Sequence, residues 1–205
     1  MKNTMIRLIE NRKSVSRYDP GVEIDDSVII EWVRLAGRSP SAFNLQNWRF
    51  IAVKNAEQKL VLQQAAFGQP QVTEASVTFI VCGQTAAYRQ LSRRLQASVE
   101  QNIIPASVAE SWVTMANDSH HENPALQRDE AIRSASLAAM TLMYAVQSAG
   151  YACGPMGGFD ARQVQEEFEL GPDEIPVMLI AVGRERTGNW PQKARRPVEE
   201  ILTVL

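Results

Sequence analysis

The chain has 205 residues, a mass of 22.8 kDa and a formal net charge of −2. Its 45% hydrophobic and 21% charged residues match an ordinary globular protein and exclude a disordered chain. The slightly acidic balance argues against nucleic acid as a partner, because proteins that follow a phosphate backbone carry a basic excess. Cys82 and Cys153 have no metal-ligand spacing, so we expect free thiols in a reducing compartment.

The length predicts one domain spanning residues 1–205. The first ten residues lack the apolar run of a signal peptide. The longest uncharged stretch has an apolar part, from Ala135 to Val146, that is shorter than the roughly 20 residues a bilayer span requires. This stretch predicts a buried helix, and we expect a cytoplasmic protein with no membrane contact.

Hydrophobic periodicity and turn residues divide the chain into helices and strands. Two loops are expected, 117–124 and 154–160, and in the first of them His120 and His121 are expected to be solvated. The expected elements are, in chain order, a helix over 3–11 capped by Asn3 or Thr4, a helix capped by Asp25 or Asp26 with an apolar face from Val28 to Ala36 and closed by Ser39-Pro40-Ser41, a strand over 48–53, a helix over 57–66, a strand over 76–82, helical structure over 86–117 broken near Pro105, helices over 129–149 and 161–168, and a strand over 176–183.

Because helices and strands do not alternate strictly, the sequence predicts an α+β fold in which helices flank a mixed central sheet. The 129–149 helix carries alanine on several faces, and a helix that is apolar nearly all round is buried, here within the subunit or between subunits. The 189–205 segment is first basic and then apolar. Such a terminal segment is expected to pack on another surface, a neighbouring subunit included.

The first candidate binding segment is Arg12-Lys13-Ser14, directly after the first predicted helix. Two cationic donors and a hydroxyl in three residues can grip a phosphate, and each charge-assisted hydrogen bond stabilises binding by about 1.5–3 kcal/mol. Spacing alone leaves a second interpretation open, since basic residues at a helix C-terminus complement the helix dipole without any ligand.

Two further loops contain residues suited to a planar ligand. Ser41, Asn44 and Gln46 precede the first strand, and amide side chains can read a heterocycle because they donate and accept together. In the 154–160 segment, the paired Gly157 and Gly158 let a backbone approach a ligand that a Cβ would exclude. A tight turn would explain the same glycines, and the segment fits neither a dinucleotide-binding nor a P-loop fingerprint.

The sequence offers no side chains for acid–base or metal catalysis. The two histidines are adjacent, and no carboxylate cluster or nucleophile motif occurs, so we predict neither a catalytic side chain nor a metal site. A phosphate grip with ring-reading amides is typical of a protein whose cofactor supplies the reactivity.

Together these segments resemble the nitroreductase family of FMN flavoproteins, especially its bacterial NAD(P)H-dependent members of similar length. The resemblance runs in order from Arg12-Lys13-Ser14 through the Ser39–Trp48 loop and Gly157-Gly158-Phe159-Asp160 to Arg195-Arg196-Pro197. It implies an obligate homodimer of α+β subunits with two FMN molecules at the interface and the 189–205 segment on the partner subunit. It also implies ping-pong chemistry, in which NADH or NADPH reduces FMN at N5 and a small nitroaromatic or quinone acceptor then takes two electrons.

The resemblance further implies which residues bind the cofactor. Arg12 and Ser14, together with Lys193 and Arg195, would hold the FMN phosphate, and Lys13 belongs to the same cofactor-binding segment. The other implied contacts are the backbone N–H groups of Gly157 and Gly158 at flavin N5, the adjoining Pro155 and Met156, Ser16 and Gln71 near the pyrimidine ring, and Pro40, Ser41 and Asn44 from the partner subunit.

Two features depart from the family pattern. Gln46-Asn47-Trp48 replaces a frequent Gln-Pro-Trp, and Ser16 and Gln71 stand where some relatives carry Lys or Arg. A cation there stabilises the anionic hydroquinone, so its absence is expected to make the flavin harder to reduce unless another charge compensates. The same resemblance is compatible with a flavoenzyme of other chemistry (a dehalogenase, a dehydrogenase or an enzyme of flavin breakdown) and with a non-enzymatic flavin-binding dimer.

Overall fold

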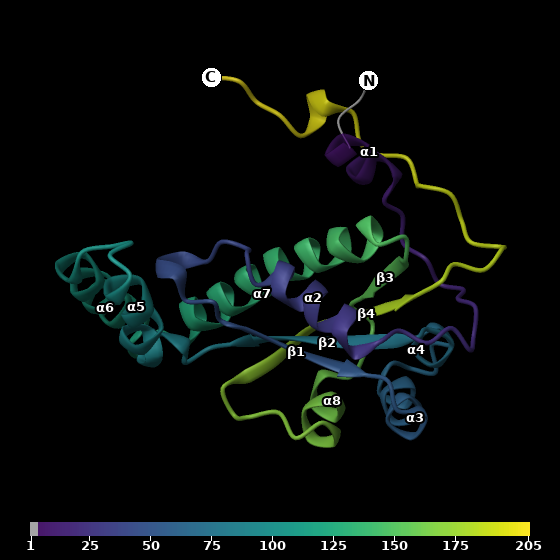
Figure 1. Ribbon diagram of the computed structural model, residues 1–205, viewed down its shortest axis with the longest axis horizontal. Coiled ribbons are helices and arrows are strands. Elements are labelled where there is room, and N and C mark those ends of the chain that lie inside the picture. Colours follow the sequence, from purple (N-terminus) through teal and green to yellow (C-terminus); the bar gives the residue numbers. More distant parts are fainter. Residues whose placement is uncertain (1–3) are drawn as a thin grey trace.

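The computed structural model describes residues 4–205 and has a four-stranded sheet at its centre (Figure 1). The strands are β1 (Trp48–Val53), β2 (Val77–Gln84), β3 (Ala152–Met156) and β4 (Glu174–Gly183), arranged in the order β1-β2-β4-β3. Every neighbouring pair among these strands is antiparallel. The α+β class is confirmed, whereas the expected mixed sheet is wrong.

Helices cover both faces of the sheet (Figure 1). α2 (Asp26–Ala36) and α7 (Pro124–Ser148) lie on one face, and α3 (Ala56–Ala65), α4 (Gln71–Glu74) and α8 (Ala161–Glu167) on the other. α5 (Leu91–Glu100) and α6 (Ala106–His120) form a hairpin at one end. Within residues 4–205, no helix combines the length and hydropathy that crossing a membrane requires.

The alternation of side chains along β2 builds two cores. Val77, Phe79 and Val81 pack with α2 and α7, whereas Ile80 and Cys82 pack in a second cluster beneath α3, α4 and α8. Successive residues of a strand point to opposite faces, and both faces are covered here. This explains why β2 reads as a nearly continuous apolar run.

α7 packs closely on the sheet because small residues meet at the contact. Ala131, Ala135 and Ala139 are fully buried, as the alanine pattern predicts. At Gly83 of β2, a Cβ would lie 2.6 Å from the Ala131 carbonyl oxygen, closer than atoms can approach. Gly83 is therefore required for this distance between helix and strand.

Two expected loops contain regular structure instead. β3 occupies Ala152–Met156, where a loop was expected from Gly154 onwards. α6 continues through the expected polar loop to His120, which is 3% exposed and stacks on Tyr88 with ring centroids 5.5 Å apart. The prediction that His120 is solvated is therefore wrong, whereas His121 is exposed as expected.

The first described helix and the C-terminal segment lie on the same side of the body (Figure 1). α1 (Thr4–Asn11) matches the expected first helix, except that the proposed cap Asn3 lies outside the described residues, and α1 has no buried residue. The C-terminal arm, 189–205, contains only a short 3₁₀ turn, η3 (Val198–Glu200), and is exposed along nearly all of its length.

Candidate functional site

Several of the expected binding residues, from separate parts of the sequence, gather at a cleft of about 240 Å³ beside β3. Its walls come from the segment before Tyr18, the turn that leads into α4, the end of β3 and the start of the C-terminal arm. The sequence-predicted residues that line it are Ser14, Ser16, Gln71, Pro155, Met156, Gly157, Gly158 and Lys193.

The N-terminal segment reaches the cleft by pairing with β3. The Val15 amide donates to the Cys153 carbonyl over 3.1 Å, and a Cβ at Gly154 would lie 2.0 Å from the Val15 carbonyl oxygen. The buried Tyr18 hydroxyl donates 3.0 and 2.9 Å hydrogen bonds toward the carbonyls of Val15 and Ala181. Burial raises the pKa of the Tyr18 phenol, so it stays neutral and holds this segment on the sheet.

Lys13 and its neighbours differ in where they point. Val15 is 3% exposed in the core, while Ser14 and Ser16 line the cleft. Lys13 forms a 2.7 Å ion pair with Glu185 and lines a separate hollow of about 120 Å³ with Arg12. The structure therefore brings Ser14 and Ser16 into the cleft. The Lys13 ammonium is paired with the Glu185 carboxylate in the separate hollow.

Gln192 brings the two basic ends of the chain together. Its side-chain amide donates to the Arg12 carbonyl over 2.5 Å, and its Oε1 accepts from Arg195 over 3.0 Å. Lys193 lines the cleft next to them. Lys193 thus shares the cleft with Ser14, while Gln192 connects the Arg12 backbone to the Arg195 side chain. Cationic donors of this kind bind a phosphate through charge-assisted hydrogen bonds.

Two glutamine side chains and a glycine loop form the opposite wall. Gln71 Nε2 donates to Gln69 Oε1 over 2.9 Å, and Gln69 Nε2 donates to the Gly158 carbonyl over 2.7 Å. A Cβ on Gly157 would meet nothing within 4 Å, and Gly157 is exposed. Gly157 therefore has no packing function inside the subunit, and its backbone is open to a ligand.

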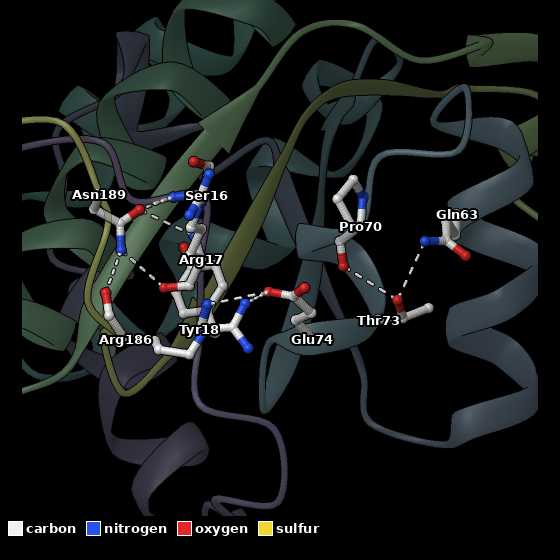
Figure 2. Close-up of polar contacts among 9 residues, drawn as sticks. All are labelled: Ser16, Arg17, Tyr18, Gln63, Pro70, Thr73, Glu74, Arg186 and Asn189. Atoms are coloured by element: carbon white, nitrogen blue, oxygen red, sulfur yellow. Dashed lines mark hydrogen bonds and ion pairs between the residues drawn. The ribbon is translucent and has the colours of Figure 1, made fainter.

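A chain of polar contacts supports both walls from behind (Figure 2). Gln63 on α3 donates to Thr73 on α4 over 3.2 Å, and Glu74 accepts from the Tyr18 amide over 3.3 Å and lies 3.6 Å from the Arg186 guanidinium. The helix that carries Gln71 is thereby connected to the segment that carries Ser16.

Pro40, Ser41 and Asn44 lie elsewhere in the subunit. The 42–45 segment packs on α5, and it leads into β1, at the sheet edge opposite β3. Phe43, Asn44 and Gln46 have φ values of 51°, 59° and 45°, a left-handed conformation that costs about 1–3 kcal/mol per residue. The Ser41 hydroxyl accepts from the Gln46 amide over 2.8 Å and helps to hold this strained loop.

Some residues of the site gave no signal in the sequence. Gln69 and Trp190 line the cleft. Gln192 connects the Arg12 backbone, near the start of the chain, to the Arg195 side chain, near its end. Each is a single residue in a polar turn or tail, where no periodicity or motif distinguishes it. Turn geometry alone, at Gly68-Gln69-Pro70, offered a weak hint for Gln69.

The described residues that line the cleft include no histidine, aspartate or glutamate. Across residues 4–205 there is also no group of three or more His, Cys, Asp or Glu side chains able to hold a metal ion. The fold and the cleft define an α+β protein whose cleft combines a lysine, two serine hydroxyls, two glutamine amides and a glycine backbone. This set of donors suits a phosphorylated planar ring.

Comparison with known proteins places the chain in a family. Residues 9–184 match the model of the nitroreductase family, and the chain belongs to that family. The chain is 32% identical to "Putative NAD(P)H nitroreductase YodC" of Bacillus subtilis (strain 168) over all of both chains.

Solved structures agree with this assignment. The "putative nitroreductase ydfN" of Bacillus subtilis is 32% identical, with a TM-score of 0.92 over 98% of each chain. A "putative nitroreductase in complex with FMN" from Exiguobacterium sibiricum 255-15 is 28% identical, with a TM-score of 0.90 over 100% of this chain and 99% of that one.

Proposed function

We propose that this protein is an FMN-dependent NAD(P)H oxidoreductase that reduces nitroaromatic or quinone acceptors. The observation that carries the proposal is the cleft beside β3, which is lined together by Lys193, by the hydroxyl residues Ser14 and Ser16, and by Gly157, whose Cβ position is open. Its family membership and its full-length similarity to relatives named NAD(P)H nitroreductases support the same reaction class.

The residues at one end of the cleft suit the phosphate of FMN, and those at the other end suit its flavin ring. Arg12, Ser14, Lys193 and Arg195 would hold the phosphate, while Lys13 balances Glu185 beside them. At the other end, the backbone N–H groups of Gly157 and Gly158 would approach N5, since no Cβ blocks them. Ser16, Gln71, Pro155 and Met156 would line the ring between these ends.

A second copy of the chain would complete the site. Pro40, Ser41 and Asn44 are distant from the cleft of their own subunit, and we propose that they contact the flavin of the partner in a homodimer. In this arrangement residues 1–205 form one domain, whose 189–205 arm packs on the partner subunit. Exposed apolar side chains of the arm support this packing.

Bound FMN supplies the redox chemistry, taking a hydride from NAD(P)H and passing two electrons to the acceptor. The cleft side chains bind and orient, since none of those described there is a carboxylic acid or a histidine. Protons for the reduced acceptor would come from water. Both cysteines are free and buried, which fits a reducing cytoplasm.

Anaerobic mixing of the FMN-loaded protein with NADH or NADPH tests the proposal. We expect rapid loss of the visible flavin absorbance, followed by its return when a nitroaromatic or quinone is added. A flavin that stays oxidised with both nucleotides would contradict the proposal and favour a flavoenzyme of other chemistry or a non-enzymatic flavin-binding dimer. A protein that binds no FMN would contradict all three.

A further inference from the structure

The C-terminal arm leaves the body at a single fixed point. Glu185, just after β4, forms a bridge with Tyr18, and the Arg186 amide donates to the Arg17 carbonyl over 3.1 Å. Gly188 then adopts a φ of 94°, which turns the chain sharply. The next residue is Asn189, whose side chain returns to the N-terminal segment.

All the hydrogen-bonding positions of the Asn189 amide are used there (Figure 2). Its Oδ1 accepts from the Ser16 amide over 2.9 Å and from the Arg17 amide over 3.0 Å. Its Nδ2 donates to the Arg17 carbonyl over 2.9 Å and to the Arg186 carbonyl over 2.8 Å. Because every partner is a backbone group, these bonds fix the direction of the chain at this point.

The residues after Asn189 depend on this anchor more than those before it. Ser16 also belongs to the segment held by Val15 and Tyr18 on the sheet. The arm, in contrast, has no strand partner among the described residues, and Gln192 gives it one further bond to the body, at the Arg12 carbonyl. Trp190 and Lys193 line the cleft one and four residues beyond the anchor.

We propose that Asn189 is a positioning residue that presents Lys193 and Arg195 to the phosphate end of the cleft. This deepens the proposed function and rests on it. A phosphate site whose cations are already ordered binds without the entropic cost of ordering them. Without the Asn189 bonds, the stretch from Trp190 to Arg195 keeps only the Gln192 bond to the body of its own subunit, and binding must then order this stretch.

Asn189→Ala is the direct test, with FMN and riboflavin as paired probes of the apo-protein. Riboflavin lacks the phosphate, so a disordered arm should lower the affinity for FMN more than the affinity for riboflavin. We expect the Kd for FMN to rise about tenfold, equivalent to about 1.4 kcal/mol. The Kd for riboflavin is expected to rise by less than about threefold.

Two matched control variants distinguish the loss of arm positioning in Asn189→Ala from a general loss of stability. Thr187→Ala changes the same turn, but its side chain makes no hydrogen bond among the described residues, so FMN affinity should stay at the wild-type value. Asn123→Ala removes an amide that accepts from the Leu126 amide over 3.2 Å and donates to Ser119 over 3.3 Å at the start of α7. It should lower Tm while the ratio of FMN to riboflavin affinity stays unchanged.

Trypsin cleavage after Lys193 and Arg195 gives a readout that needs no flavin. We expect faster cleavage of the arm in Asn189→Ala than in Thr187→Ala. Equal cleavage in the two, equal FMN affinity in the two, or equal losses of FMN and riboflavin affinity in Asn189→Ala would each overturn the assignment of Asn189. These results leave FMN binding by the wild type intact, whereas a wild type that binds no FMN would overturn the proposed function as well.

Discussion

The helix α7 and the C-terminal arm are both rich in apolar residues, yet their surroundings differ completely. On α7, Ala139 and Leu142 are fully buried between helices and sheet. On the arm, Ile201 is 65% exposed and Val204 is 84% exposed. α1 resembles the arm, since Met5 and Ile9 are about half exposed.

The difference shows which parts of the sequence the subunit uses for its own folding. The apolar face of α7 packs on the sheet and on α2, so most of its apolar side chains are buried within one chain. Apolar surface left exposed in a subunit marks an interaction surface, and a terminal arm with several such residues fits a second copy of the chain. We therefore expect core substitutions to act on stability and arm substitutions to act on assembly and cofactor binding.

The largest effect is expected in the core. Leu142→Ala removes a fully buried side chain from the cluster that α7 forms with the sheet. Such a truncation costs about 2–5 kcal/mol of unfolding free energy. Urea unfolding measures it, and Leu202→Ala, the same change in the arm, is the control.

Leu202 is 57% exposed, so its truncation should leave the unfolding free energy of a single chain unchanged and weaken the dimer. Equal losses of stability in the two variants at every protein concentration would remove the distinction between core and arm.

Gly157→Val tests whether the backbone at this exposed glycine lies against the flavin. A side chain here would enter the cleft, because no protein atom lies within 4 Å of the Cβ position. A displacement of about 1 Å can slow a reaction about 100-fold, so the rate of flavin reduction per bound FMN should fall by about that factor.

Tm should change little in the same variant, since Gly157 is exposed. A normal rate per flavin in a protein of lowered Tm would show that Gly157 serves the fold and does not contact the flavin.

Arg195→Ala tests the arm alone. The residue is exposed and bonds to Gln192, so the core should remain intact. Loss of one charge-assisted contact of about 1.5–3 kcal/mol predicts a Kd for FMN that is about 10- to 150-fold higher. Equilibrium dialysis measures this, with urea unfolding as the control, and undiminished retention of FMN would contradict the role of Arg195.

Alkaline pH should lower the stability of the core through its two buried thiols. Burial raises the pKa of the Cys82 thiol to about 12, with the negative charge of Glu174 adding to the effect, and burial raises that of Cys153 to about 11. In the unfolded chain, thiols release their protons near pH 8.5, so the unfolded state gains stability above that pH while the folded state keeps its protons.

The stability contributed by these two protonated thiols is present below about pH 8.5 and is lost as the pH rises toward 11–12, by up to about 1.4 kcal/mol per pH unit for each thiol. Urea unfolding at several alkaline pH values should show a shallower decline in Cys82→Ala than in wild type. Identical slopes would contradict this account of the thiols.

Elements with a clear apolar pattern could be predicted from the sequence. β1 was predicted with its exact bounds, and α7 was expected to be buried because its alanines leave no polar face. β3 was missed because glycine and proline normally interrupt strands. Pro155 is tolerated at this edge of the sheet, and Gly154 is required by the Val15 backbone, a contact that only the folded chain reveals.

The candidate site shows the same limit. The order of its motifs allowed the family resemblance, and the structure places Ser14, Gln71 and the two glycines around one cleft. Their contacts with FMN stay predictions. Asn189 could not be found from the sequence, because a single asparagine in a polar tail becomes informative only when its backbone partners are known.

Sedimentation velocity, recorded at a flavin wavelength and at a protein wavelength, tests the central claim most directly. That claim is that the cleft binds FMN and that a second copy completes it. The account predicts that flavin sediments with a species of two 22.8 kDa chains at one FMN per chain. A stable flavin-loaded species of one chain, or a two-chain species that sediments without flavin in excess FMN, would contradict it.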